Sequence, residues 1–389
     1  MPKQVGNVQL MQKMNRLKVL NYIRRNPDIS RPVLSEKTGL SLASITNVTT
    51  YLLDIGLLTE SGIEPAERVG RKSILLRFNS EAYGLIFASI SEDEAEIFYT
   101  NLEGKIISSH GFHITDKSAE QFISVTRKCV GKLIEKYGRE HILAVGINFS
   151  GLVLDGNRFV LSSSMKWKEL DIKKIFEDAT GLPVFVENIS KLRAVWYSSS
   201  HKDTYNKNVI FVDLDNGIGA VQVVLGAVNS SVLGEIGHTT VEKDGVECFC
   251  GNRGCLEAMC SAERIVSTFA ALSGNESAKL DDISSLFDSG DVNAQKAISE
   301  CAAYLGMGLS NLVSLFHPDV IVINEGQFSG CRRVSELAVI EMQKRTYPAL
   351  WHDTEVRYVD IDLRETIAGA AFETCDSLFD ISFEHNPVE

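Results

Sequence analysis

The sequence predicts an α/β protein in two parts, a small helical unit with a hairpin over residues 1–80 and a larger unit over residues 81–389. Charge divides them: residues 1–80 hold 12 Lys and Arg against 6 Asp and Glu, although the whole chain of 389 residues carries −12. The second part contains continuous apolar runs, Val209–Asp213 and Val320–Ile323, which are typical of strands buried on both faces. A hydrophobic content of 44% excludes a mainly disordered chain.

Three helices are expected in the first part. From Met11 to Arg25, apolar residues recur mainly at three- and four-residue steps, which indicates one amphipathic helix. Ser30 is expected to cap a short second helix that Gly39 ends. Ser41 is expected to cap a third helix that runs to about Ile55.

The third helix has an apolar face and an opposite face of small, polar, uncharged side chains. Such side chains let a recognition helix enter the major groove of double-stranded DNA. Two strands are expected next, over residues 57–60 and 73–77, and the tip between them carries cations that can reach phosphates. This order of elements is typical of a winged helix-turn-helix. The residues assigned to DNA binding are Ser41, Ser44, Thr46, Asn47, Arg68, Arg71 and Lys72.

The first part admits a second interpretation, a three-helix module for protein interaction or dimerisation with a solvated charge run. The hairpin after the helix-turn-helix and the excess of six positive charges in residues 1–80 favour DNA. The expected partner of this part is therefore a double-stranded DNA operator.

The most specific motif in the chain combines one histidine and three cysteines, His238, Cys248, Cys250 and Cys255. Four ligands of this kind complete a tetrahedral Zn²⁺ site and leave no position for a catalytic water, so a structural zinc ion is expected. A loop of free buried cysteines beside an unrelated histidine is the alternative. The other cysteines are expected to be small buried apolar residues: Cys129, Cys260, Cys301, Cys331 and Cys375.

With these motifs the chain resembles the ROK family of repressors, open reading frames and kinases, in its repressor branch with an N-terminal winged helix. The resemblance implies an actin-like, sugar-kinase-like fold of the ribonuclease H type, with two lobes and a ligand cleft between them. It places a small lobe at about residues 81–195 plus the C-terminal helix, and a large lobe at about residues 196–365 with a zinc loop at residues 238–257.

The residues that serve phosphoryl transfer in family kinases are missing. The segment that corresponds to the family's Asp-x-Gly-Gly-Thr-Lys, Ser89–Glu94, has no glycine and three carboxylates. Ile189 stands where the family's catalytic aspartate follows Glu-Asn, and it cannot accept a proton. The second phosphate loop survives only partly at Asp215–Ala220, and Asn324-Glu325 replaces a Gly-Gly pair. The protein is therefore expected not to be an enzyme.

The resemblance also implies sugar contacts at Asn188, Glu235, His238 and Glu257, where one nitrogen of His238 could bind zinc and the other face the cleft. Glu235 and Glu257 admit a second role, hydrogen bonding within the zinc loop. Ser164 and Lys166 replace a family asparagine and glycine, so the effector is expected to differ from glucose or to be absent. Lys166 either contacts the phosphate of a sugar phosphate or is solvated.

These expectations combine into a transcriptional regulator, with repression as the expected outcome, of genes for carbohydrate metabolism or uptake. A sugar or sugar phosphate would shift a homodimer, or a tetramer, between operator-competent and incompetent states. A homodimer makes the operator approximately palindromic. With no signal peptide and no long apolar segment, a cytoplasmic location without a membrane partner is expected. The rival functions are a ligand-free protein-interaction scaffold and an active sugar kinase.

Overall fold

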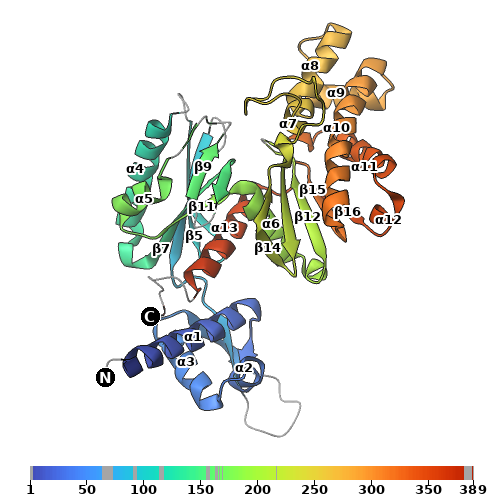
Figure 1. The fold of residues 1–389 in the computed structure, drawn as a ribbon. Helices are drawn as coiled ribbons and strands as arrows, with labels where there is room; N and C mark the ends of the chain where they lie inside the picture. The colour runs from blue at the N-terminus through green and yellow to red at the C-terminus, as the bar shows by residue number, and fades with distance from the viewer. Residues whose placement is uncertain are drawn as a thin grey trace.

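The structure is a computed structural model that describes residues 3–63, 73–90, 94–113, 118–154, 158–162, 165, 167–168, 170–215, 217–380 and 388. Within these residues the chain forms an N-terminal head and two α/β lobes. Figure 1 shows the head at one end of the molecule and the lobes side by side, with helices α6 and α13 between them. This is the two-part α/β architecture that the sequence predicts.

The head consists of three helices and a twisted β-hairpin to which a short strand adds. Its elements are α1 (Lys3–Arg25), β1 (Ile29–Ser30), α2 (Arg31–Thr38), α3 (Leu42–Asp54), β2 (Leu58–Ile63) and β3 (Ile74–Phe78). The first helix begins at Lys3, eight residues before the expected start, because residues 3–10 contain no proline and a lone glycine costs a helix only about 1 kcal/mol.

The two expected helix caps in the head have different outcomes. Ser41 caps α3 as predicted, since its Oγ accepts a hydrogen bond from the Ser44 backbone N–H at 3.2 Å. Ser30 occupies the cap position of α2, but its side chain makes no cap bond. Pro32 in the first turn removes one donor that would otherwise need a partner, and Gly39 ends α2 with a φ of 72°.

Lobe 1 is built on a five-stranded mixed sheet in the order β11-β7-β4-β5-β6, counted over the described residues. Its side chains alternate: Leu85 and Phe87 of β4 pack toward α13 and the head, whereas Ile86 and Ala88 pack toward α4 and α5. Its elements are β4 (Gly84–Ile90), β5 (Glu94–Asn101), β6 (Ile106–His113), α4 (Ala119–Tyr137), β7 (Ile142–Phe149), β8 (Leu152–Leu154), β9 (Arg158–Ser162), β10 (Trp167–Lys168), α5 (Ile172–Thr180) and β11 (Val184–Asn188).

Lobe 2 repeats this plan, with five strands in the order β14-β13-β12-β15-β16 in the described part of the chain. The runs predicted as buried strands are confirmed as β12 and β15, which pair in parallel with Val209 opposite Val320. Its elements are β12 (Asn208–Asp213), β13 (Gly219–Val224), β14 (Ala227–Gly234), α7 (Leu256–Met259), α8 (Ala262–Ser273), α9 (Leu280–Asp288), α10 (Val292–Phe316), β15 (Val320–Asn324), α11 (Arg333–Arg345), α12 (Pro348–Trp351) and β16 (Glu355–Val359).

Two helices join the lobes. Helix α6 (Ile189–Ser200) packs against the sheet of lobe 2, and α13 (Leu363–Leu378) packs against the sheet of lobe 1 and against α6. The core of the head is continuous with the core between β4, β7 and α13. The head is therefore packed on lobe 1 and α13, whereas α6 connects this body to lobe 2.

Candidate functional sites

The exposed face of α3 carries the side chains predicted to contact DNA. Ser41, Thr46 and Asn47 are exposed and Ser44 is half-buried. The Thr46 hydroxyl donates to the Leu42 carbonyl at 2.8 Å. Opposite them, Ile45, Val48 and Leu52 are buried, which fixes the rotation of the helix.

The predicted wing has an observed base and a tip that the structure does not describe. Strands β2 and β3 pair antiparallel, with a register shift between Glu60 and Gly62. Arg68, Arg71 and Lys72 lie outside the described residues, so their predicted role stays a prediction.

The four predicted zinc ligands converge: their ligand atoms all lie within 4.8 Å of one another. Two measured edges are 3.7 Å, between the Sγ atoms of Cys250 and Cys255, and 3.8 Å, between Cys248 Sγ and His238 Nδ1. A tetrahedral Zn²⁺ ion with bonds of about 2.3 Å to sulfur and about 2.0 Å to nitrogen requires ligand separations of about 3.6–3.8 Å. The geometry of this cluster thus matches the donor set and size of a structural metal site.

The backbone of the cysteine loop requires its glycines. Gly251 and Gly254 have φ values of 93° and 64°, in the left-handed region that glycine favours. A Cβ on Gly254 would collide with the Glu242 carbonyl. Burial raises the pKa of the Cys255 thiol to about 12, so a cation that binds there must displace a strongly held proton.

Glu257, a predicted sugar ligand, lies where the second phosphate loop reaches the zinc loop. Its Oε2 accepts a hydrogen bond from the Ile218 backbone N–H at 2.8 Å. Cβ atoms built on Gly217 and Gly237 would come within 2.6 and 3.1 Å of the same oxygen. The two glycines therefore leave the space that this carboxylate occupies.

The remaining predicted sugar ligands lie on different elements. Asn188 caps α6 by accepting from the Lys191 N–H and donates to the Gly151 carbonyl at 2.7 Å, so its amide is partly occupied. Glu235 is exposed, at the start of the turn that leads to His238. Ser164, Lys166 and Asn216 lie outside the described residues.

A buried ionic network joins α6 to the start of the second phosphate loop at Asp215 and to Asn324. Arg193 of α6 is 9% exposed and pairs with Asp213 at 2.9 Å and with Asp215 at 2.7 Å. Asn324 donates to Asp213 at 2.7 Å. Ile189 is 8% exposed, in the first turn of α6, so the site of the family's catalytic base is apolar.

Sequence reasoning did not find this network, although one signal was present. Lys191 and Arg193 interrupt an otherwise mainly apolar helix, and Asp213 ends an apolar strand. Charged residues in such places are seldom buried unless they are paired.

A second group of residues that sequence reasoning missed joins the head to α13. Asp376 accepts from Arg24 at 3.0 Å and from Arg25 at 3.1 Å. The guanidinium of Arg24 also lies over the rings of Phe372 and Phe379.

Comparisons with known proteins cover almost the whole chain. Residues 89–370 match the model of the ROK family, and residues 15–59 match a winged helix-turn-helix DNA-binding model. The chain is similar to the xylose repressor of Bacillus spizizenii, with 26% identity over 360 residues, 90% of this chain and 92% of that protein. It is also similar to the N-acetylglucosamine repressor of Escherichia coli O6:H1, with 26% identity over 336 residues and 82% of each chain.

A solved structure has the same fold along its length. It belongs to a ROK family transcriptional regulator described as a homolog of the E. coli Mlc protein, with a TM-score of 0.79 and 24% identity over 93% of this chain and 95% of that chain.

None of the helices in the described residues combines the length and the apolar character that crossing a membrane requires.

Proposed function

Because this chain belongs to the ROK family and carries a winged helix-turn-helix, we propose that it is a DNA-binding transcriptional repressor that responds to a sugar. The proposal rests on the presence of both units in one chain, which is similar over 90% of its own length to a protein named as a xylose repressor. The protein would regulate genes for carbohydrate metabolism or uptake. It would be located in the cytoplasm, together with its operator DNA.

A regulator agrees better with the site chemistry than a kinase does. The names of the relatives support a regulator. Ile189 offers no general base, and the Arg193–Asp213 pair occupies the space beside the second phosphate loop. The ROK domain would then bind its ligand without chemical change.

For DNA binding, the exposed face of α3 would enter the major groove. Asn47 is the side chain best suited to read a base, because asparagine can bond an adenine edge with both atoms of its amide. Ser41, Ser44 and Thr46 would position the helix on phosphates and bases, and Arg68, Arg71 and Lys72 would hold the backbone. A homodimer would present two such helices to an approximately palindromic operator.

For effector binding, Glu257, Asn188, Glu235 and His238 would contact sugar hydroxyls in the cleft between the lobes. The support is that Glu257 is held at the glycines of the second phosphate loop, and that His238 turns Nδ1 toward the cysteines, which leaves Nε2 for a ligand. Zn²⁺ on the four-residue cluster would fix the orientation of that imidazole and of the loop.

The test is selection of operator DNA from a random library with the full-length, zinc-loaded protein, followed by gel-shift titration. We expect an enriched palindromic sequence, and we expect Asn47→Ala to weaken binding to it about 10- to 100-fold, as for the loss of one bidentate base contact. Lys243→Ala, an exposed lysine of lobe 2, is the matched control and should bind as the wild type does. Absence of any enriched sequence would contradict the proposal.

A further inference from the structure

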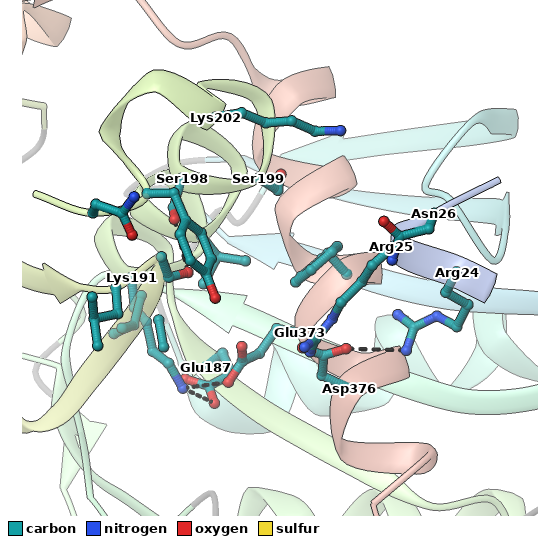
Figure 2. Close-up of a pocket in the computed structure, with 18 of the residues that line it drawn as sticks. Arg24, Arg25, Asn26, Glu187, Lys191, Ser198, Ser199, Lys202, Glu373 and Asp376 are labelled. Atoms are coloured by element: carbon teal, nitrogen blue, oxygen red, sulfur yellow. Dashed lines mark hydrogen bonds and ion pairs between the residues drawn. The ribbon is translucent and has the colours of Figure 1, made fainter. Parts of the chain in front are cut away.

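A groove of 1240 Å³ lies where the head and the two lobes meet helices α6 and α13. Its walls come from the end of α1, from β8, from the turn between β13 and β14, and from α6 and α13 (Figure 2). The four residues predicted to contact a sugar, Asn188, Glu235, His238 and Glu257, do not line it. The groove is therefore a different site from the one predicted for the sugar.

One wall of the groove is a buried cluster of two carboxylates and one ammonium group. Lys191 Nζ lies 2.7 Å from Glu187 Oε1 and 2.8 Å from Glu373 Oε1, and the Lys191 side chain is 10% exposed. Since one ammonium faces two carboxylates, acceptor oxygens remain for hydroxyl donors. The neighbouring Asn148, 2% exposed and paired in register with Glu187, has an Nδ2 without a partner among the described residues.

Further cationic side chains line the groove outside this cluster. In Figure 2 the Arg25 side chain extends into the groove from α1, and Lys202 lies at its far edge beside Ser199. The Arg25 side chain is 60% exposed and shares Asp376 with Arg24, so it can turn to another anion while Arg24 keeps that carboxylate. The lining holds four cationic side chains against three carboxylates, an excess of one positive charge.

We propose that this groove binds an anionic polyhydroxy compound, a sugar phosphate, with its hydroxyls on Glu187 and Glu373 and its phosphate between Arg25 and Lys202. The hydroxyls would donate to the carboxylates, and the phosphate oxygens would accept from the guanidinium and the ammonium group. Apolar side chains such as Val195 and Val228 would cover the carbon face of the sugar.

This site goes beyond the proposed function because it adds a second ligand position that contacts the DNA-binding head itself. A ligand here would contact α1, α6 and α13 together, so it would bind tightly only to the arrangement in which the three converge. Operator binding and sugar phosphate binding would then be coupled, each changing the affinity of the other by the same factor.

The experiment is isothermal titration of the full-length, zinc-loaded protein with glucose 6-phosphate, fructose 6-phosphate, N-acetylglucosamine 6-phosphate and xylulose 5-phosphate. Their unphosphorylated parents and inorganic phosphate are titrated in parallel. We expect at least one sugar phosphate to bind, and to bind at least tenfold more tightly than its parent sugar and than inorganic phosphate. Lys202→Ala should weaken that binding at least tenfold, and Ser199→Trp, which fills the groove from an exposed helix end, should abolish it.

Two matched variants separate the groove from the cleft and from the surface. Lys243→Ala, at an exposed position of lobe 2, should bind the sugar phosphate as the wild type does, whereas Glu235→Gln tests the predicted sugar site separately. The proposal is overturned if none of the four compounds binds, if inorganic phosphate binds equally well, or if Ser199→Trp keeps the affinity that Glu235→Gln loses. Operator binding by Ser199→Trp without ligand is measured separately, and its retention shows that a failure concerns the groove and not DNA recognition.

Discussion

The two lobes share one strand order but differ in what they insert between equivalent strands. Between its third and fourth strands, β6 and β7, lobe 1 has the single long helix α4, whereas lobe 2 places the cysteine loop and four helices between β14 and β15. Each sheet alternates apolar side chains toward two covering layers, so both of its faces are buried. The sheets therefore supply the frame, and the connections between strands carry the candidate metal site.

Helix α6 directs one buried cation toward each lobe, and the two cations have different surroundings. Lys191 meets Glu187 of lobe 1 and Glu373 of α13, while Arg193 meets Asp213 and Asp215 of lobe 2. The partners differ in hydration: the Asp213 side chain is 3% exposed, against 13% for Glu187. Replacing the cation should therefore lower the free energy of unfolding more for Arg193, which faces lobe 2, than for Lys191.

The largest expected effect is confined to lobe 2. Cys255→Ser, or removal of Zn²⁺ with a chelator, should destabilise lobe 2 by more than about 3 kcal/mol, because the binding energy of a structural zinc ion contributes to folding. Hydrogen exchange with mass spectrometry should show lost protection in residues 236–259 and in α10, with lobe 1 unchanged. Cys129→Ser, a partly buried cysteine of lobe 1 outside the cluster, is the control. Equal loss of protection in both lobes would contradict the expectation that the metal site stabilises lobe 2 alone.

The next largest effect on stability is expected from replacing the two buried cations of α6. Arg193→Met should lower the free energy of unfolding by about 3–5 kcal/mol, because it leaves Asp213 buried without its positive partner. Lys191→Met should cost less, about 1–3 kcal/mol, since Glu187 and Glu373 face the groove and can recover water there. Urea unfolding followed by tryptophan fluorescence measures both values. A larger loss for Lys191→Met would reverse the order argued for the two lobes.

The pH dependence of the free energy of unfolding should distinguish the cluster around Lys191 from the cluster around Arg193. Burial raises the pKa of Glu187 above its usual range, although the Lys191 ammonium acts against this. With the folded pKa above the unfolded value, the contribution of Glu187 is fully present below about pH 4.5 and is lost as pH rises through the folded pKa. The unfolding free energy of the wild type, minus that of Glu187→Gln, should therefore fall between pH 4.5 and 7. A difference that rises with pH contradicts this sign.

How far the sequence predicted the molecule depended on whether the signal was local. The caps, the apolar strands and the Cys-x-Cys spacing are patterns within a few residues, so the helices of the head, β12, β15 and the metal cluster were all predicted. The Arg193–Asp213 pair joins residues 20 positions apart, and the Arg24–Asp376 pair joins residues 352 positions apart. Pairs at such distances leave no periodic pattern, so only the folded chain brought them together.

The smallest expected effect tests how the head is joined to the lobes. Ser41→Ala should cost about 1 kcal/mol, because it removes the side-chain acceptor of the Ser44 N–H at the start of α3. Ser30→Ala is the matched control: its buried hydroxyl has no hydrogen-bond partner among the described residues, so its loss should not destabilise the head. Hydrogen exchange at both variants should report any change in α3 and, through the shared apolar core, in α13 and lobe 1. Lobe 2 lies beyond α6 and outside that core, so a matching change in α10 would mean that the head senses both lobes equally.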